Sequence, residues 1–342
     1  METKILKPTQ INEAAKLINE GQLVSFPTET VYGLGADATN ESAVKQVYQA
    51  KGRPSDNPLI VHVADVATVE KYAQPLSDSA KKLMAKFWPG SLTMIFKLKP
   101  NALSTAVTGG LDTAAFRCPR NQTTLDLIRI SGKPMVGPSA NTSGKPSPTT
   151  AQHVYHDLHG KIAAIMDDGP TEVGVESTVL DLSTKQPAIL RPGAVTKEEI
   201  EEIIGVPVDD ERHHVGVTEV PKAPGMKYKH YAPNAQVYIV DPDDNWQEVN
   251  NWIKRNHPTD PIGVMAFSNV LKSVDWNPNV QLISLGENVN DASHNLFREL
   301  RDFDENPQYK IIFTQGVEPS GLGEAYMNRL NKSAGQMHFK QL

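Results

Sequence analysis

The order of helix-like and strand-like segments constrains the fold of this chain more than any other feature. Up to about residue 205 the two kinds of segment alternate irregularly, and strand-like runs at 177–182 and 188–191 follow each other directly. This pattern predicts an α/β fold whose first domain is α+β-like, a twisted mixed sheet with helices packed on it, rather than a strictly parallel sheet.

From residue 237 onward the alternation becomes regular. Apolar strands are expected at 237–240, 262–267, 281–284 and 311–313, with helices between them around 245–255, 291–301 and 323–331. Regular alternation of this kind predicts a smaller, Rossmann-like, three-layer α/β domain with a mainly parallel sheet.

A change of composition separates the two parts. The chain has 342 residues, which is more than one ordinary core requires. Residues 206–235 are rich in proline, glycine, histidine and charge and have little periodicity, which is typical of a linker. We therefore expect a first domain over 1–205, a linker or lid over 206–235 and a C-terminal domain over 236–342.

The overall composition excludes several classes of protein. The hydrophobic fraction of 39% and the charged fraction of 22% are typical of soluble globular proteins, and the net charge of -6 argues against a protein that coats nucleic acid. Cys118 is the only cysteine, so an intrachain disulfide and a multi-cysteine zinc site are excluded. Because no apolar run is long enough for a signal or a membrane span, we expect a cytoplasmic protein.

Residues 26–63 carry the most unusual chemistry. The chain is expected to turn at Gly33 and Gly35 and to continue into a helix that ends near Lys51 and Arg53. Two cations at this spacing, beside a polar glycine-rich turn, suit a bound phosphate. Cations at a helix C-terminus also complement the helix dipole, so both interpretations stand.

Three further polar features lie in or after apolar strands. His62 falls in the strand-like run 59–63 and is either a ligand-binding residue or a hydrogen-bonded core residue. Arg117 falls in the run 113–118 and either binds a ligand or points to solvent from an edge strand. The turn 138–144, PSANTSG, offers hydroxyls, an amide and backbone N–H groups, as a binding site or an ordinary surface loop would.

A basic and aromatic cluster lies inside the expected linker. It consists of Lys227, Tyr228, Lys229, His230 and Tyr231. Such a cluster suits a lid that closes over a ligand. An exposed tether is the alternative.

Five pieces of the first part, in this order, resemble the Sua5/YciO/YrdC family: FPTETVYGLG from Phe26, KGRPSDNPLIVH from Lys51, GPSANTSG from Gly137, ESTV from Glu176 and LRPG from Leu190. The run PGMKYKHYAP and the additional C-terminal domain are similar to the longer, two-domain branch of that family. The resemblance implies synthesis of L-threonylcarbamoyl-AMP from L-threonine, bicarbonate and ATP with release of pyrophosphate, for the threonylcarbamoyl modification (t6A) of adenosine 37 in tRNAs that read ANN codons.

The resemblance also implies a set of site residues. Those expected to bind ATP are Lys51, Arg53, Asn57, Ser139, Asn141, Arg191 and Tyr231, and those expected to bind threonine are Thr30, His62, Arg117 and Ser177. Lys51 and Arg53 would act electrostatically, without a covalent nucleophile. Mg²⁺ would bridge the ATP phosphates rather than occupy a protein cage. The partners implied are the threonylcarbamoyl-transferase proteins downstream and, indirectly, tRNA.

Two other functions remain as alternatives at this point. A double-stranded RNA or tRNA-binding protein without adenylate chemistry would show an RNA affinity that falls steeply with salt, although the acidic net charge counts against it. Weak RNA binding is also compatible with the enzyme itself. A regulatory module would bind threonine or nucleotide but release no pyrophosphate.

Overall fold

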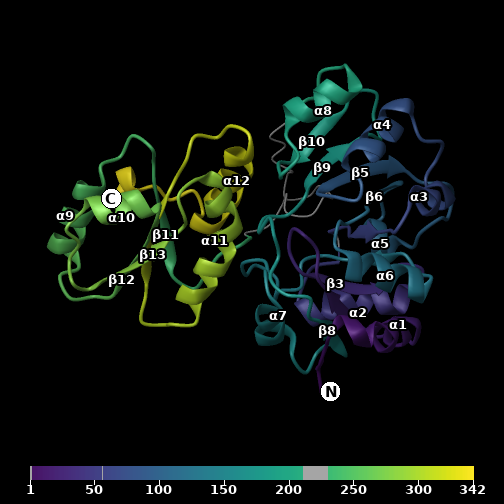
Figure 1. Cartoon of the computed structure of the whole chain (residues 1–342), viewed down its shortest axis with the longest axis horizontal. Coiled ribbons are helices and arrows are strands. Elements are labelled where there is room, and N and C mark those ends of the chain that lie inside the picture. The colour runs from purple at the N-terminus through teal and green to yellow at the C-terminus, as the bar shows by residue number, and fades with distance from the viewer. Residues whose placement is uncertain (1, 56, 211–229) are drawn as a thin grey trace. The chain divides into compact units, whose positions relative to one another are not determined.

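The structure is a computed structural model that describes residues 2–55, 57–210 and 230–342, and the chain forms two units (Figure 1). Among the described residues, the second unit consists of 144–146, 173–175 and 230–342, and the first unit contains the rest. Most of the linker expected at 206–235 lies outside the described residues. The two units are treated separately below.

The first unit is built on a ten-stranded sheet. The strand order is β1-β8-β2-β3-β7-β4-β6-β5-β9-β10. The strands are β1 (Lys4–Leu6), β2 (Val24–Phe26), β3 (Gly33–Asp37), β4 (Ile60–His62), β5 (Leu92–Lys97), β6 (Thr113–Arg117), β7 (Met135–Val136), β8 (Ala164–Met166), β9 (Thr178–Asp181) and β10 (Ala188–Arg191). Because β4 and β6 pair in parallel whereas β5 and β6 pair antiparallel, the prediction of a mixed sheet is confirmed.

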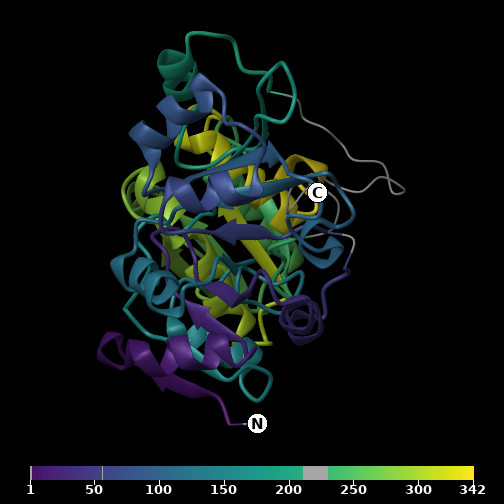
Figure 2. The ribbon, with the colours of Figure 1, turned by 90° about the vertical axis from the view of Figure 1, so that its right-hand side faces the viewer.

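Nine helical segments of the first unit accompany this sheet in the described residues. They are η1 (Pro8–Gln10), α1 (Ile11–Asn19), α2 (Glu41–Lys51), α3 (Val66–Tyr72), α4 (Asp78–Phe87), α5 (Thr105–Thr108), α6 (Gln122–Ser131), α7 (Ala151–Leu158) and α8 (Lys197–Ile204). Helix α1 follows β1 beside the N-terminus, at one end of the sheet (Figure 2). The side chain of Asn40 caps α2 by accepting a hydrogen bond from Ala43 N. Gly52, at a positive φ of 62°, ends α2 after Lys51, so Arg53 lies in the loop that follows.

The glycines at 33 and 35 correct one prediction, because they lie in strand β3 rather than in a turn. Strand β3 pairs antiparallel with β2. A Cβ atom on Gly35 would come within 2.6 Å of the backbone oxygen of Val24, and one on Gly33 within 2.8 Å of the Phe26 ring. Glycine is needed here for close packing across the strand pair.

The two faces of the first sheet are packed differently. One face carries a large apolar core that includes Val61, Phe116 and Met94, with α2 and α4 packed on it. The other face carries a small buried cluster over the middle strands, made of Ile60, Ile95, Ala115 and Val179. Because residues alternate between faces along a strand, the polar residues next to this small cluster are held on its side of the sheet.

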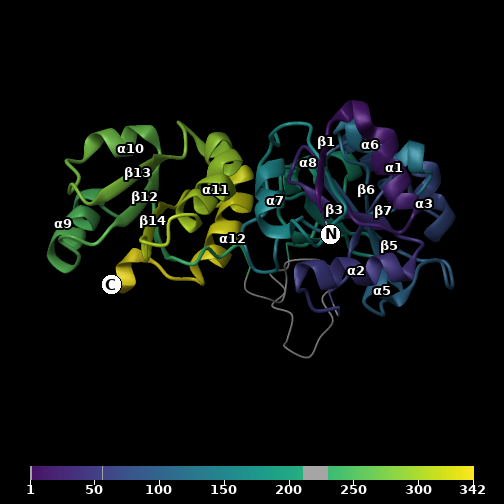
Figure 3. The ribbon, with the colours of Figure 1, turned by 90° about the horizontal axis from the view of Figure 1, so that it is seen from below.

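The second unit is a three-layer α/β domain, as its regular alternation predicts. Its sheet has the order β11-β14-β12-β13, and its strand pairs are parallel. The elements are β11 (Gln236–Val240), α9 (Trp246–Asn256), β12 (Ile262–Ala266), α10 (Ser268–Ser273), β13 (Val280–Ser284), α11 (Val289–Asp304), β14 (Ile311–Gln315), α12 (Leu322–Ala334) and η2 (Phe339–Gln341). Helices α9 and α10 lie on one side of the sheet and α11 and α12 on the other (Figures 1 and 3).

Two short segments that precede residue 230 also belong to the second unit. In the first of them, Gly144 O accepts a hydrogen bond of 2.9 Å from Ala232 N, and Lys145 Nζ lies 2.7 Å from Asp304 Oδ2 on α11. Within the described parts of the chain, no helix is long and apolar enough to cross a membrane.

Candidate active site

Three polar side chains form a row on one face of the first sheet. His62 of β4 and Arg117 of β6 are register partners on parallel strands. The antiparallel register of β5 and β6 brings Thr93 next to Arg117 on the other side. The next residues along the same face are the apolar cluster at Ile60 and Ile95, so the polar row borders a packed, dry surface.

Three different groups hold the guanidinium of Arg117. Its Nε donates to Gly90 O at 3.2 Å, and its Nη1 donates to Thr30 Oγ1 at 2.8 Å. Its Nη2 lies 2.7 Å from Glu29 Oε1 in an ion pair whose two side chains are 5% and 2% exposed. Arg117 is therefore a buried cation at the C-terminal end of the interior strand β6, which excludes the interpretation that it points to solvent from an edge strand.

Glu29 is the buried anion of this site, and sequence reasoning assigned it no role. Its Oε1 accepts a hydrogen bond of 3.0 Å from Ser91 Oγ, and its Oε2 accepts one of 3.1 Å from Arg120 N. Burial raises the pKa of Glu29, but the charge and hydrogen bond of Arg117 outweigh burial and hold that pKa below its usual range. The only sequence signal was a carboxylate inside the motif FPTET.

His62 presents an uncharged ring beside Arg117. Burial, and then the charge of Arg117, lowers the pKa of His62 to about 3. Its ring contacts Phe26 edge-on, with centroids 5.2 Å apart, and its Nδ1 is buried with no hydrogen-bond partner among the described residues. A Cβ atom on Gly137 would lie 2.6 Å from Nδ1, so glycine at 137 leaves the space that the ring occupies. A buried imidazole nitrogen without a partner suits a ligand contact better than a satisfied core position.

Ser177, which is expected to bind threonine, contacts Arg191, which is expected to bind ATP. Its Oγ lies 2.7 Å from Thr93 Oγ1. Arg191 of β10 donates to Ser177 O from both Nε, at 3.1 Å, and Nη2, at 2.9 Å. Sequence reasoning missed Thr93, whose signal was a polar residue inside a mostly apolar strand.

Lys51 ties the end of α2 to the polar turn at 138–144. Its ammonium group donates to the backbone oxygens of Ser139 and, at 2.6 Å, of Asn141. The backbone oxygen of Lys51 accepts a hydrogen bond of 2.9 Å from Ser143 N. Lys51 is only 2% exposed, so it does more than complement the helix dipole. Lys51, Ser139 and Asn141, all expected to bind ATP, are thus in direct hydrogen-bond contact.

Arg53 and Asn57 form a second pair at the start of β4. The Nη2 of Arg53 donates to Asn57 O at 3.3 Å and to Pro58 O at 3.2 Å. The side chain of Asn57 is buried, and its Oδ1 has no hydrogen-bond partner among the described residues. A buried amide oxygen in this condition requires an additional donor, which a ligand or water supplies.

The remaining expected residues belong to the linker. Tyr231 lies in the second unit, where its ring packs against Phe297 of α11 with centroids 5.0 Å apart, and His230 contacts Tyr231. Tyr231 has a positive φ of 63°. Lys227, Tyr228 and Lys229 lie outside the described residues.

The described ranges contain no group of three or more histidine, cysteine, aspartate or glutamate side chains arranged to hold a metal ion. Glu29, the buried carboxylate nearest the row, is already paired with Arg117.

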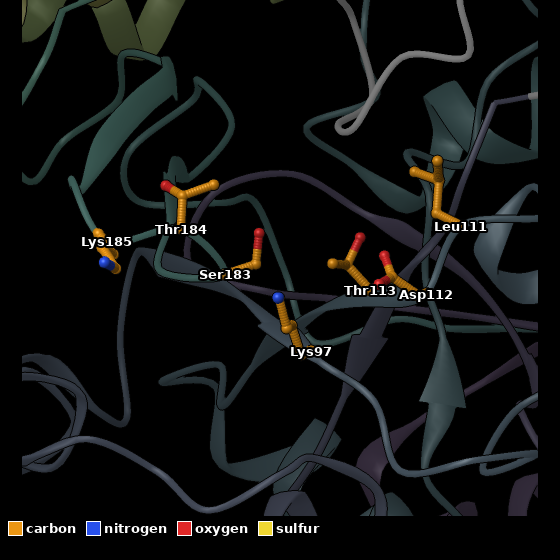
Figure 4. A pocket seen from close by; sticks show the side chains of 7 residues that line it. All are labelled: Lys97, Leu111, Asp112, Thr113, Ser183, Thr184 and Lys185. Atoms are coloured by element: carbon orange, nitrogen blue, oxygen red, sulfur yellow. The ribbon is translucent and has the colours of Figure 1, made fainter.

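A separate hollow of about 480 Å³ lies at the far end of β5 and β6 (Figure 4). Its lining residues are Lys97, Leu111, Asp112, Thr113, Ser183, Thr184 and Lys185. Lys97 is four residues beyond Thr93 on β5, a distance of about 13 Å along an extended strand. This hollow contains none of the residues expected to bind threonine or ATP.

Comparison with protein families gives two matches that together span most of the chain. The family Sua5_yciO_yrdC, described as "Telomere recombination", matches residues 16–193. The family Sua5_C, described as "Threonylcarbamoyl-AMP synthase, C-terminal domain", matches residues 195–335.

Individual relatives agree with these matches. The threonylcarbamoyl-AMP synthase of Bacillus subtilis is 46% identical over 95% of this chain and 93% of its own length, and that of Pyrococcus abyssi is 45% identical over 95% and 94%. A crystal structure of P. abyssi Sua5 complexed with L-threonine superimposes with a TM-score of 0.89 at 42% identity, covering 98% of both chains. The chain described here belongs to the Sua5/YciO/YrdC family, in the form that also carries the Sua5 C-terminal domain.

Proposed function

We propose that this chain is an L-threonylcarbamoyladenylate synthase, a nucleotidyltransferase that makes threonylcarbamoyl-AMP for t6A formation at adenosine 37 of tRNAs reading ANN codons. The observation that carries the proposal is the buried Arg117 beside the neutral His62, which together suit the carboxylate and the amine of an amino acid. Support comes from full-length relatives that bear this enzyme name and from the related protein that is complexed with L-threonine.

In this proposal the polar row binds threonine. Arg117 binds the carboxylate, a task for which its planar fork is suited. Thr30, His62 and Ser177 contact the amine and the hydroxyl group. A pocket that hydrogen-bonds the hydroxyl and also fits the methyl group selects threonine over valine, which lacks the hydroxyl, and over serine, which lacks the methyl.

The residues at the end of α2 and in the turn after β7 bind ATP in this proposal. The set is Lys51, Arg53, Asn57, Ser139, Asn141 and Arg191; the contact expected from Tyr231, which belongs to the second unit, stays a prediction. After its ammonium group loses a proton, threonine combines with bicarbonate to give a carbamate and water. An oxygen of the carbamate attacks the α-phosphorus of ATP, and the bond from that phosphorus to the bridging oxygen breaks to release pyrophosphate. Lys51 and Arg53 offset the repulsion between the two anions and the charge on the leaving group. Mg²⁺, arriving on the ATP phosphates, supplies further charge neutralisation.

The proposal also covers the expected lid, the proteins that use the product and the compartment of the reaction. The lid expected over Lys227 to Tyr231 stays a prediction, because Lys227, Tyr228 and Lys229 lie outside the described residues. The adenylate then passes to threonylcarbamoyl-transferase proteins, which modify the tRNA, and the reaction takes place in the cytoplasm.

Pyrophosphate release by the purified full chain tests this function. The assay contains ATP, Mg²⁺ and bicarbonate, with L-threonine present, omitted or replaced by L-serine. We expect release that depends on threonine and is at least about tenfold slower with serine, because the methyl pocket is then empty. Absence of release from protein with a cooperative melting transition would refute the proposal, and salt-dependent binding of double-stranded RNA by the same sample would then favour the RNA-binding alternative.

A further inference from the structure

The guanidinium of Arg117 is held from three directions before any substrate arrives. Its Nε and Nη1 make hydrogen bonds to Gly90 O and Thr30 Oγ1, and its Nη2 lies 2.7 Å from the carboxylate of Glu29. The contact with Glu29 is a close ion pair rather than a well-aligned hydrogen bond. A guanidinium has five N–H donors, so further donors remain for a substrate carboxylate.

Glu29 is itself fixed by three separate segments of the chain. Ser91 Oγ donates to its Oε1 at 3.0 Å, and Arg120 N donates to its Oε2 at 3.1 Å. Its backbone oxygen accepts a hydrogen bond of 3.1 Å from Glu172 N. A carboxylate held in this way keeps a fixed position, and it can therefore fix the position of the Arg117 guanidinium that it contacts.

We propose that Glu29 is the positioning residue for Arg117: it fixes the orientation of the guanidinium that receives the amino-acid carboxylate and offsets its buried charge. This inference rests on the proposed function. An arginine side chain has four rotatable bonds, so without the contact to Glu29 its guanidinium would adopt more orientations before the substrate binds. A buried guanidinium without an anion is also unfavourable, and Glu29 supplies that anion permanently.

Electrostatics alone does not predict whether a Glu29 substitution strengthens or weakens threonine binding. Removing the negative charge relieves repulsion of the substrate carboxylate but also removes attraction for the substrate ammonium group. Because threonine is a zwitterion, these two effects have opposite signs. The loss of a fixed Arg117 orientation then decides the outcome, and threonine binding becomes weaker.

The test compares Glu29→Gln with Ser91→Ala in the full chain. Glutamine keeps the size of the side chain and removes its charge, whereas Ser91→Ala removes one anchor of Glu29 and leaves both members of the ion pair in place. Glu41→Gln is the matched control, since Glu41 is an exposed glutamate whose side chain pairs with Lys45 on α2 and makes no contact with Glu29 or Arg117 in the described residues. Threonine affinity is measured by calorimetry, and pyrophosphate release gives the KM for each substrate and kcat.

We expect Glu29→Gln to raise the Kd and the KM for threonine by at least about tenfold, because it removes the charged partner of Arg117. We expect Ser91→Ala to raise both by about threefold, because it removes one hydrogen bond to Glu29 but leaves the ion pair in place. The KM for ATP stays within twofold in both, and Glu41→Gln resembles the unsubstituted chain. A purely structural role predicts a lower melting temperature with unchanged threonine affinity, which would overturn the inference. If Glu29→Gln does not fold, Ser91→Ala decides alone.

The failure of this inference is distinguishable from the failure of the proposed function. An unsubstituted chain that binds threonine and turns over, together with variants that bind it equally well, overturns only the role of Glu29. An unsubstituted chain that binds no threonine overturns both.

Discussion

Arg117 lies directly opposite His62 on the neighbouring parallel strand, and its charge contributes to keeping the imidazole of His62 unprotonated. Burial is the larger cause, and together they lower the pKa of His62 to about 3. The pair therefore combines a permanent cation with a neutral polar ring in one dry row. Such a row offers an amino acid a site for its carboxylate and an uncharged contact for its other groups.

Replacing Arg117 by lysine tests the geometry of the proposed carboxylate site. Lysine keeps the positive charge but loses the planar fork and the simultaneous contacts to Gly90, Thr30 and Glu29. We expect the Kd for threonine, measured by calorimetry, to rise by about 10- to 100-fold. Arg120→Lys is the control, because the Arg120 side chain is 58% exposed and should tolerate the change. Equal threonine affinity in both variants would remove Arg117 from the proposed site.

Arg53→Ala tests the phosphate site. Arg53 follows α2 and contacts the backbone at Asn57 and Pro58. If its charge stabilises the leaving pyrophosphate, kcat/KM for ATP should fall by about 100-fold, while the Kd for threonine remains unchanged. Lys45→Ala removes an exposed cation from the same helix and serves as the control. Unchanged ATP kinetics in Arg53→Ala would exclude a phosphate contact at this position.

His62 predicts a dependence of stability on pH. Its pKa is about 3 in the folded chain, against an ordinary value of 6.5, so between these pH values the unfolded chain binds a proton that the folded chain does not. This contribution is fully present above about pH 6.5 and is lost as the pH falls, by up to about 1.4 kcal/mol per pH unit.

Denaturant unfolding of the parent chain and of His62→Asn, from pH 4.5 to 7.5, measures that contribution. The free energy of unfolding of His62→Asn should fall less steeply as the solution is acidified. Parallel curves for the parent and His62→Asn would mean that His62 is not buried in its neutral form.

Gly137→Ala tests whether the space beside His62 matters. The new Cβ atom would lie 2.5 Å from the Phe26 ring and 2.6 Å from His62 Nδ1. Overpacking of this kind costs about 1–3 kcal/mol of stability, and displacement of His62 should also weaken threonine binding. Gly132→Ala is the comparison, because it adds a Cβ in open space at a positive φ of 67° and should affect stability only. Full threonine affinity in Gly137→Ala would show that His62 does not need its present position.

A chain truncated to residues 1–235 tests the expected domain boundary. The first unit contains its own apolar cores, so we expect the truncated chain to show a cooperative thermal transition by circular dichroism. Its melting temperature should be lower than that of the full chain, because Lys145 loses its partner Asp304. An insoluble product or a non-cooperative melt would place the boundary elsewhere.

Local patterns made several parts of this structure predictable. Helix α2 begins after its Asn40 cap, and Thr196 and Glu199 form the capping box expected at the start of α8, because capping depends on residues within one turn. The parallel sheet of the second unit follows from the spacing of its strands and helices. The glycines of β3 were misassigned to a turn because their reason is a contact with another strand.

The sequence by itself determined the two-part alternation of elements, the order of the family motifs and the types of residue available for a site. Only the tertiary structure decided which of these residues meet. Glu29 and Ser91 are 62 positions apart in the chain, and Thr30 and Arg117 are 87 apart, yet each pair is in hydrogen-bond contact. Such contacts depend on the order and register of β4, β6 and β5 in the sheet, which are set by packing across the whole unit and not by local sequence.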